Sequence, residues 1–97
     1  MKTRVELDPQ VVEFVRALAP EPRRLVRRAL RGLVEQRGDI KQLEGELSGY
    51  CRLRIAGYRV IVRLYAERGR PVARCVFAER RSIVYEIFGD LLSRTRG

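Results

Sequence analysis

The sequence predicts an α+β fold in which helices pack on one face of an antiparallel sheet. Apolar residues recur at helical spacing through the first third of the chain, and a period of two replaces this spacing from Tyr50 onward. Helical spacing returns after Ser82. A helix pair and a sheet must each bury an apolar face, so we expect them to pack on each other. A chain of 97 residues predicts one domain, spanning residues 1–97.

The N-terminal part predicts a strand followed by a helix hairpin. Charged and apolar side chains alternate over residues 3–7, and Asp8-Pro9 is typical of a helix start. This helix should end near Ala19, because the prolines at 20 and 22 interrupt it. The second helix has one apolar stripe, and Gly38 is its expected C-terminal cap. The stripe consists of Leu25, Val26, Ala29, Leu30, Leu33 and Val34.

A three-stranded antiparallel meander and a C-terminal helix should follow the polar segment 39–48. The predicted strands cover residues 50–55, 58–65 and 72–78, joined by tight turns. On the second strand Val60 and Val62 mark the core face, and on the third Cys75 and Phe77 should point to one side. If all helices cover one face of the sheet, the other face is left for a ligand.

The composition favours an anionic partner. The net charge is +9, and only two of the 21 basic residues are lysines, Lys2 and Lys41. Arginine favours bidentate contacts with phosphate, which fits nucleic acid. Five arginines lie on the outer face of the second predicted helix, and like charges at this spacing repel one another. They are Arg23, Arg24, Arg27, Arg28 and Arg31. Solvated basic faces of an arginine-biased sequence are the competing interpretation.

Several classes of site are disfavoured by the residues that are missing. The chain has no histidine and no Cys-x-x-Cys pair, so we expect neither a metal nor a cofactor, and no histidine-based nucleophile. Cys51 and Cys75 lie in predicted strands, where we expect two free, buried thiols. No apolar run reaches the roughly 20 residues of a membrane span. We therefore expect a cytoplasmic protein without a membrane partner.

Four motifs in the second half of the chain resemble the RelE/ParE superfamily of bacterial type II toxins. A Leu-x-Gly opening lies within residues 43–50, and a basic strand contains Arg52 and Arg54. A Gly-Tyr-Arg turn follows at residues 57–59, and an Arg-x-x-Val-Tyr ending closes the pattern at residues 81–85. The resemblance implies a RelE-like fold and the toxin of a toxin-antitoxin system. It implies either an mRNA endoribonuclease or a protein that inhibits DNA gyrase.

The RelE type implies a set of residues that act on the scissile phosphate. The catalytic candidates are Arg59 and Tyr85 on matching positions, Arg81 or Arg80 as the distal arginine, and Arg52 on the first strand. The family's lysines on the first strand are absent: a gap-free alignment places Tyr50 and Arg52 there, and a one-residue gap places Cys51 and Leu53 there. We add a group of expected RNA-binding residues on the strands. These are Tyr50, Arg54, Arg63 and Arg74.

Two functions follow from the resemblance as hypotheses. The first is a metal-independent, ribosome-dependent mRNA endoribonuclease that inhibits translation, with mRNA on the ribosome as its target. The second is a ParE-like binding protein that inhibits DNA gyrase without nuclease activity. Glu79 lies where RelE-type proteins often have the distal arginine, which favours the second unless Arg80 or Arg81 takes that role. Both imply a cognate antitoxin, and the charge of +9 predicts an acidic one.

Overall fold

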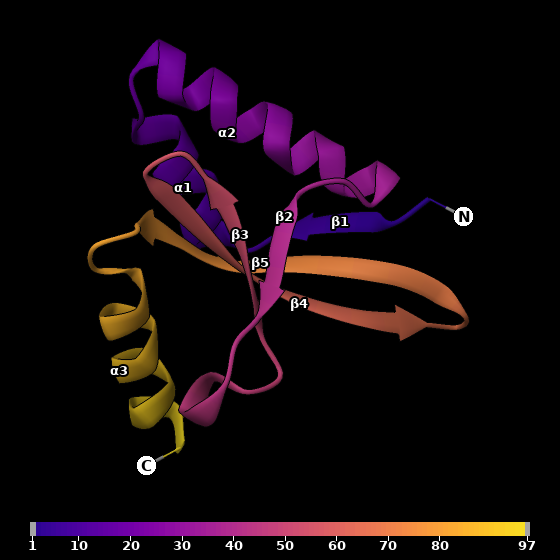
Figure 1. Cartoon of the computed structure of the whole chain (residues 1–97), viewed down its shortest axis with the longest axis vertical. Helices are drawn as coiled ribbons and strands as arrows, with labels where there is room; N and C mark the ends of the chain where they lie inside the picture. Colours follow the sequence, from indigo (N-terminus) through magenta and orange to yellow (C-terminus); the bar gives the residue numbers. More distant parts are fainter. Residues whose placement is uncertain (1, 97) are drawn as a thin grey trace.

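The computed structural model describes residues 2–96 and has the predicted α+β architecture (Figure 1). Its sheet has the strand order β1-β5-β4-β3-β2; β1 is parallel to β5, and the other pairs are antiparallel. The strands are β1 (Arg4–Leu7), β2 (Asp39–Gln42), β3 (Cys51–Ile55), β4 (Tyr58–Glu67) and β5 (Arg70–Arg80). The helices are α1 (Pro9–Ala17), α2 (Pro20–Gly32) and α3 (Val84–Arg96), with short 3-10 turns η1 (Leu33–Glu35) and η2 (Gly45–Leu47).

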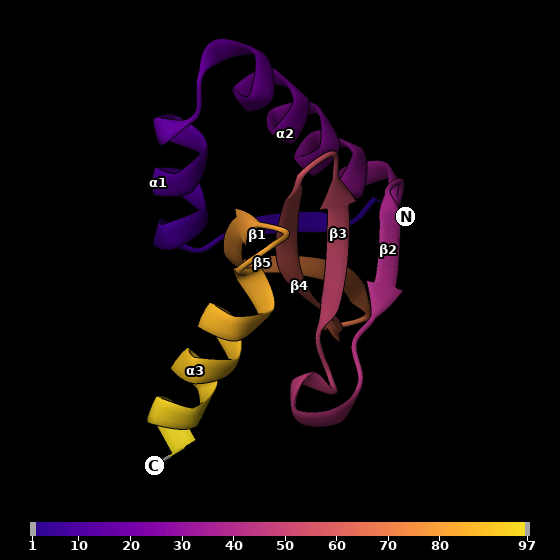
Figure 2. The ribbon, with the colours of Figure 1, turned by 60° about the vertical axis from the view of Figure 1, so that its left-hand side comes forward.

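The helix hairpin covers one face of the sheet, as predicted (Figure 2). Val11 of α1 and Val26 of α2 have no exposed surface, and they pack in one core cluster with Leu53, Val60 and Val62. The side chain of Gln10 also ties α1 to β5, because it accepts a hydrogen bond from the Ala78 amide at 2.8 Å and donates one to the Ala78 carbonyl at 2.7 Å. The hairpin is therefore fixed on β4 and β5.

The final helix corrects the expectation that all helices share one face. Val84 and Phe88 of α3 pack with Ile61 and Phe77, which form a separate cluster. Because Ile61 lies between Val60 and Val62 on β4, this cluster is on the opposite face of the sheet. The face that we expected to remain open for a ligand is therefore partly covered by α3.

A β-bulge explains why Phe77 faces α3. Ile61 pairs with Phe77 while Val62 pairs with Cys75, so Val76 is an extra residue in β5. The bulge shifts the alternation by one residue, which places Cys75 in the hairpin core and Phe77 under α3. The prediction that Cys75 and Phe77 point to the same side is wrong for this reason.

Two further expectations needed correction. The segment 39–48 contains an edge strand, β2, which pairs with β3 from Asp39 opposite Arg54 to Gln42 opposite Cys51. The second helix passes at its C-cap, Leu33, into the 3-10 turn η1; Gln36, whose φ is 58°, caps that turn, and Gly38 lies beyond it with a φ of 143°. Gly38 therefore does not end the helix. The position that a Cβ of residue 38 would occupy lies against the side chain of Leu53.

The turn between β3 and β4 is the predicted two-residue turn, and its first residue is strained. Ile55 pairs with Tyr58, so Ala56 and Gly57 are the turn residues. Ala56 has a φ of 51°, whereas Gly57 has no positive φ. Among two-residue hairpin turns this pattern is that of type II′, which prefers glycine at the first position.

We expect Ala56→Gly to stabilise the protein by about 1 kcal/mol, because glycine adopts a positive φ without steric cost. Gly57→Ala is the matched variant: nothing lies within 4 Å of a Cβ built there, so a gain of about 0.4–1 kcal/mol is expected from the unfolded chain. Urea unfolding of both variants measures these shifts. A loss of stability in Ala56→Gly would contradict the turn assignment.

The two cysteines lie in one row across the sheet and are both free. Cys51 and Cys75 each pair with Val62, from opposite sides. Two strand spacings separate their backbones by about 10 Å, beyond the reach of a disulfide. Burial raises the pKa of Cys51, and it raises the pKa of Cys75 from 9.0 to about 12, with the charge of Asp8 as a second cause.

This pKa shift predicts a loss of stability in alkali. The unfolded thiol of Cys75 ionises near pH 9, while the folded one keeps its proton to about pH 12. Its contribution to stability is therefore complete below pH 9 and is lost as the pH rises toward 12. We expect the urea midpoint of the wild type to fall more steeply over this range than that of Cys75→Ala. Parallel slopes in the two proteins would contradict the prediction.

Candidate functional site

The β3–β4 turn gathers arginines from three segments of the chain. Arg54 of β3 pairs directly with Arg59 of β4, so both lie on the sheet face that carries α3. The end of β5 joins them, because the Arg81 amide donates a hydrogen bond to the Gly57 carbonyl at 2.9 Å. We call Arg54, Arg59 and Arg81 the turn arginines. Arg80 pairs with Tyr58, which packs in the hairpin core, so it belongs to the opposite face.

Arg59 is the buried member of the turn arginines. Its side chain is 9% exposed, and Nη1 donates hydrogen bonds to the Ala56 carbonyl at 2.9 Å and the Tyr58 carbonyl at 2.8 Å. Within residues 2–96 its Nε and Nη2 have no hydrogen-bond partner, and neither atom is fully buried. No ion pair joins Arg59 to its cross-strand neighbour Glu79 in this part of the chain. The turn carbonyls thus hold the guanidinium in place, and its Nε and Nη2 remain able to donate hydrogen bonds to a ligand.

Arg54 and Arg81 are exposed, and neither forms an ion pair or a side-chain hydrogen bond within residues 2–96. Arg52 differs: its side chain is 17% exposed and Nη1 binds the carboxylate of Asp39 at 3.1 Å and the Asp39 carbonyl at 2.9 Å. Lys41 pairs with Arg52 across β2 and β3, and it is exposed. Lys41 was not predicted as a site residue, because β2 has one apolar residue, Ile40, and its sequence does not indicate a strand.

Tyr50, Arg63 and Tyr65 form a second group farther along β4. The Arg63 guanidinium lies 5.9 Å from the ring centroids of both Tyr50 and Tyr65, within the range of a cation–π contact. Tyr50 also packs edge-on against Phe88 of α3, with the centroids 5.0 Å apart. Four residues of β4 separate Arg63 from Arg59, which corresponds to about 13 Å. Tyr65 was not among the predicted site residues.

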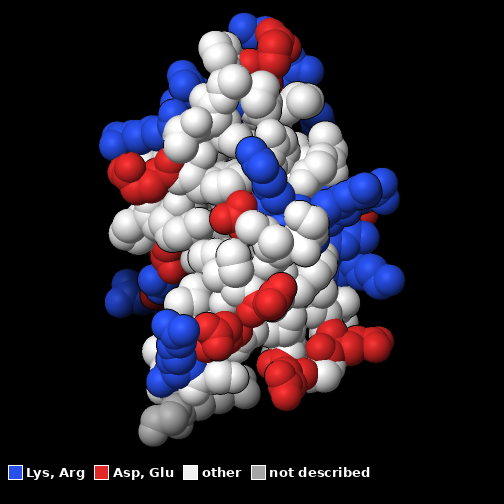
Figure 3. All heavy atoms as spheres, turned by 90° about the vertical axis from the view of Figure 1, so that its left-hand side faces the viewer, with Lys and Arg blue, Asp and Glu red and all other residues white. Residues whose placement is uncertain are grey.

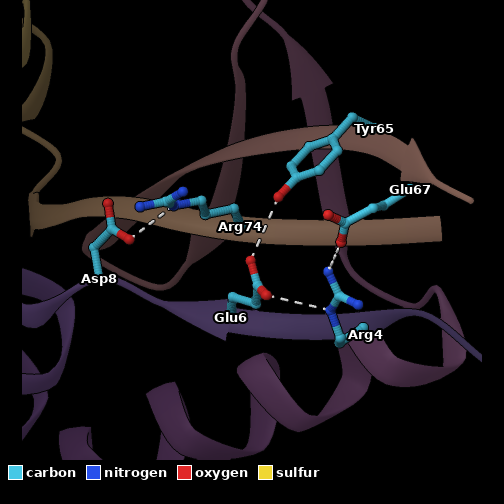
Figure 4. A network of polar contacts seen from close by, with 6 residues as sticks. All are labelled: Arg4, Glu6, Asp8, Tyr65, Glu67 and Arg74. Atoms are coloured by element: carbon cyan, nitrogen blue, oxygen red, sulfur yellow. Dashed lines mark hydrogen bonds and ion pairs between the residues drawn. The ribbon is translucent and has the colours of Figure 1, made fainter. Parts of the chain in front are cut away.

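Arg74 takes part in a network of opposite charges across β1, β4 and β5 (Figure 4). Its Nε donates to the Asp8 carboxylate at 2.9 Å, and this bond raises the pKa of the guanidinium. Arg4 binds both Glu6 and Glu67 beside it. Tyr65 donates to Glu6 at 3.4 Å. With carboxylates on both sides, Arg74 is already neutralised and is poorly placed to bind phosphate.

Tyr85 does not lie among the arginines. It lines an open hollow of about 650 Å³ together with Glu46, Glu86 and Asp90. Acidic side chains also gather on the lower part of the face shown in Figure 3, where α3 and the η2 loop lie in Figure 1. These carboxylates would repel a phosphate group close to the Tyr85 hydroxyl.

The structure therefore brings together Arg54, Arg59 and Arg81, with Arg52 two residue pairs farther along the same strands. Arg80 points to the other face, Arg74 is neutralised, and Tyr85 is on an acidic surface. No group of three or more His, Cys, Asp or Glu side chains in residues 2–96 is arranged to hold a metal ion. No helix in this range has the length and apolar character that a membrane span requires.

Comparison of the sequence with known protein families found no match, and comparison with curated proteins found none. Comparison with solved structures did find related folds. The RelBE2 toxin-antitoxin complex of Mycobacterium tuberculosis contains a chain with a TM-score of 0.68 and 21% identity; the match covers 84% of this chain and 100% of that one. The RelE-RelB complex of Pyrococcus horikoshii OT3 has a TM-score of 0.62 and 26% identity, with 84% and 97% covered.

A third similar structure is the YoeB/ParE toxin of Agrobacterium tumefaciens, with a TM-score of 0.64, 14% identity, and 81% and 99% of the chains covered. The matched structures are thus toxins or chains of toxin-antitoxin complexes. These matches cover 81–84% of this chain and 97–100% of the matched chains. The fold of this chain is therefore similar to that of RelE-type toxins.

Proposed function

We propose that this chain is the toxin of a type II toxin-antitoxin system and acts as a metal-independent mRNA endoribonuclease on the ribosome. The observation that carries the proposal is the group of turn arginines on a RelE/ParE fold. Arg54, Arg59 and Arg81 place three positive charges at one end of the sheet, and none of them is neutralised by an ion pair within residues 2–96. Such a group suits a phosphate that gains negative charge during reaction.

The proposed reaction is attack of a ribose 2′-hydroxyl on the adjacent phosphorus. The 2′-oxygen loses its proton and bonds to phosphorus, and the bond from phosphorus to the 5′-oxygen breaks. The products are a 2′,3′-cyclic phosphate and a 5′-hydroxyl, which takes up a proton. Arg59 is the proposed main stabiliser of the pentavalent intermediate, because the turn carbonyls already hold its guanidinium in place.

The general base and acid come from the same neighbourhood or from the ribosomal complex. Tyr85 is our sequence-based candidate, and Tyr50 is the alternative on the sheet. Tyr50 lies on the same face of the sheet as the turn arginines, because it contacts Arg63 and packs against Phe88 of α3. A site with strong charge stabilisation but weak proton transfer depends on orientation of its substrate, which a ribosome can supply. The reaction would take place in the cytoplasm.

The proposed partner is a cognate acidic antitoxin. Two of the structural neighbours above are complexes of a toxin with its antitoxin. With a net charge of +9, this chain should bind an acidic segment that orders on binding. Co-expression of a neighbouring reading frame of low pI should restore growth. If charge dominates, the complex should weaken as salt concentration rises.

A ParE-like inhibitor of DNA gyrase is the second candidate, and one observation favours it. Tyr85, which the nuclease hypothesis needs near phosphate, lies beside Glu46, Glu86 and Asp90. A protein that acts only by binding needs no proton donor at that place. Such a protein would use its basic surface for association alone.

Primer extension on cellular mRNA after brief induction separates the two candidates. The nuclease should produce cuts at fixed positions within codons, in translated messages only. The gyrase inhibitor should produce none, and should instead change plasmid supercoiling and induce the SOS response. Growth arrest with neither signature would overturn both candidates.

A further inference from the structure

The outer face of α2 carries a dense row of arginines that the candidate site does not use. Arg24, Arg27, Arg28 and Arg31 are exposed, and we call them the α2 arginine face. Glu21 pairs with Arg24 at 2.7 Å and is the one acidic residue of α2. Arg27, Arg28 and Arg31 have no ion pair and no side-chain hydrogen bond within residues 2–96. The described residues therefore leave these three charges unneutralised.

The geometry of α2 fixes the direction of this face. At 100° per residue the four arginines fall within an arc of about 100°. Val26 and Leu30 are buried on the opposite side of the helix, in the core cluster with Leu53 and Val60 of the sheet. The arginines therefore point away from the sheet, as the outer position of α2 in Figures 1 and 2 indicates. The turn arginines lie on the other face of the sheet, so the two surfaces are separate.

Arg23 marks the boundary of the α2 arginine face. It is half-buried, and its Nη2 donates to the carbonyls of Leu18 at 2.8 Å and Arg16 at 3.2 Å. It thereby caps the end of α1 and fixes the angle between the helices. The four outer arginines have no comparable structural task. Their mutual repulsion at three- and four-residue spacing destabilises the helix on its own, and an anionic partner would remove that repulsion.

We propose that the α2 arginine face binds the phosphate backbone of a nucleic-acid duplex without reading its sequence. The row extends about 10 Å from Arg24 to Arg31, which suits contact with several phosphates. A protein partner would need an apolar centre at the interface, and between Arg24 and Arg31 the one exposed large apolar side chain is Leu25, at 46% exposure. Nucleic-acid interfaces are instead polar and strongly basic. Binding of this kind does not depend on the nuclease activity proposed above.

The test is fluorescence anisotropy of a labelled duplex RNA of about 20 base pairs with the full chain over a range of salt concentrations. The triple variant Arg27→Gln, Arg28→Gln and Arg31→Gln should bind at least ten-fold more weakly near 0.1 M salt. The slope of log K against log salt should fall by about 3, since each lost phosphate contact removes about 0.9. A thermal melt by circular dichroism establishes that the variant is folded.

The matched control removes the same charge elsewhere, with Arg68→Gln, Arg70→Gln and Arg94→Gln, all at exposed positions away from α2. It should weaken binding less than three-fold. Equal losses in the two triple variants would overturn the proposal, because binding would then follow net charge alone. Unchanged binding in the α2 variant would also overturn it. Poly-glutamate that binds more tightly than the duplex, with the same dependence on α2, would assign the face to an acidic protein instead.

Discussion

Replacement of Arg59 by alanine should abolish growth arrest on induction and should also destabilise the fold. The first effect follows from the proposed role of its guanidinium at the phosphate. The second follows from the contacts of Nη1, since the substitution leaves the Ala56 and Tyr58 carbonyls without their donor. Lost hydrogen bonds of partly buried groups cost about 1–3 kcal/mol in unfolding free energy.

Two further variants separate these effects of Arg59. Arg54→Ala removes an exposed charge on the neighbouring strand, so it should reduce toxicity with a stability change within about 0.5 kcal/mol. The double variant Arg54→Ala with Arg81→Ala should abolish toxicity in a protein that melts like the wild type. Growth arrest is measured after induction, and stability is measured by a circular-dichroism melt. A folded Arg59→Ala variant that arrests growth as well as the wild type would remove Arg59 from the site.

The prediction of the fold succeeded where periodicity is strong. The stripe of α2 and the alternation of β3 are long enough to specify their buried faces, and Val26, Leu30 and Leu53 are buried as expected. The prediction failed where a single residue determines which face of the sheet a side chain occupies. The bulge at Val76 changes the face of Phe77 and gives α3 its packing surface, and no pattern in the residues of β5 marks a bulge.

The candidate site was predicted less well because side-chain environments depend on tertiary contacts. Arg59 was expected on a sheet face, and its position in β4 agrees, but its bonds to the turn carbonyls could not be inferred from alternation. Similarly, Arg74 looks like a free charge in the sequence, although Asp8 is 66 residues away and binds it. Tyr85 matches a family motif by spacing, yet the acidic residues beside it come from both α3 and the η2 loop.

Gly38→Ala should be among the most destabilising single substitutions in the chain. Its φ of 143° lies in a region that side-chain-bearing residues rarely adopt. A Cβ at this position would lie 2.8 Å from Leu53 Cδ1, closer than real Cβ contacts. Leu53 is fully buried and packs on all sides, so it has little room to move. Backbone strain and overpacking each cost about 1–3 kcal/mol, so we expect a loss of about 2–6 kcal/mol.

A double-mutant cycle with Leu53 separates the two causes. Leu53→Ala alone should cost about 2–5 kcal/mol, because it leaves a cavity in the core. In the double variant, the truncated Leu53 can no longer clash with the new Cβ, so only the backbone strain of Gly38→Ala should remain. The combined loss in urea unfolding should then be smaller than the sum of the single losses by at least 1 kcal/mol. Strict additivity would show that the cost at Gly38 comes from its backbone alone and that Leu53 does not limit the space beside it.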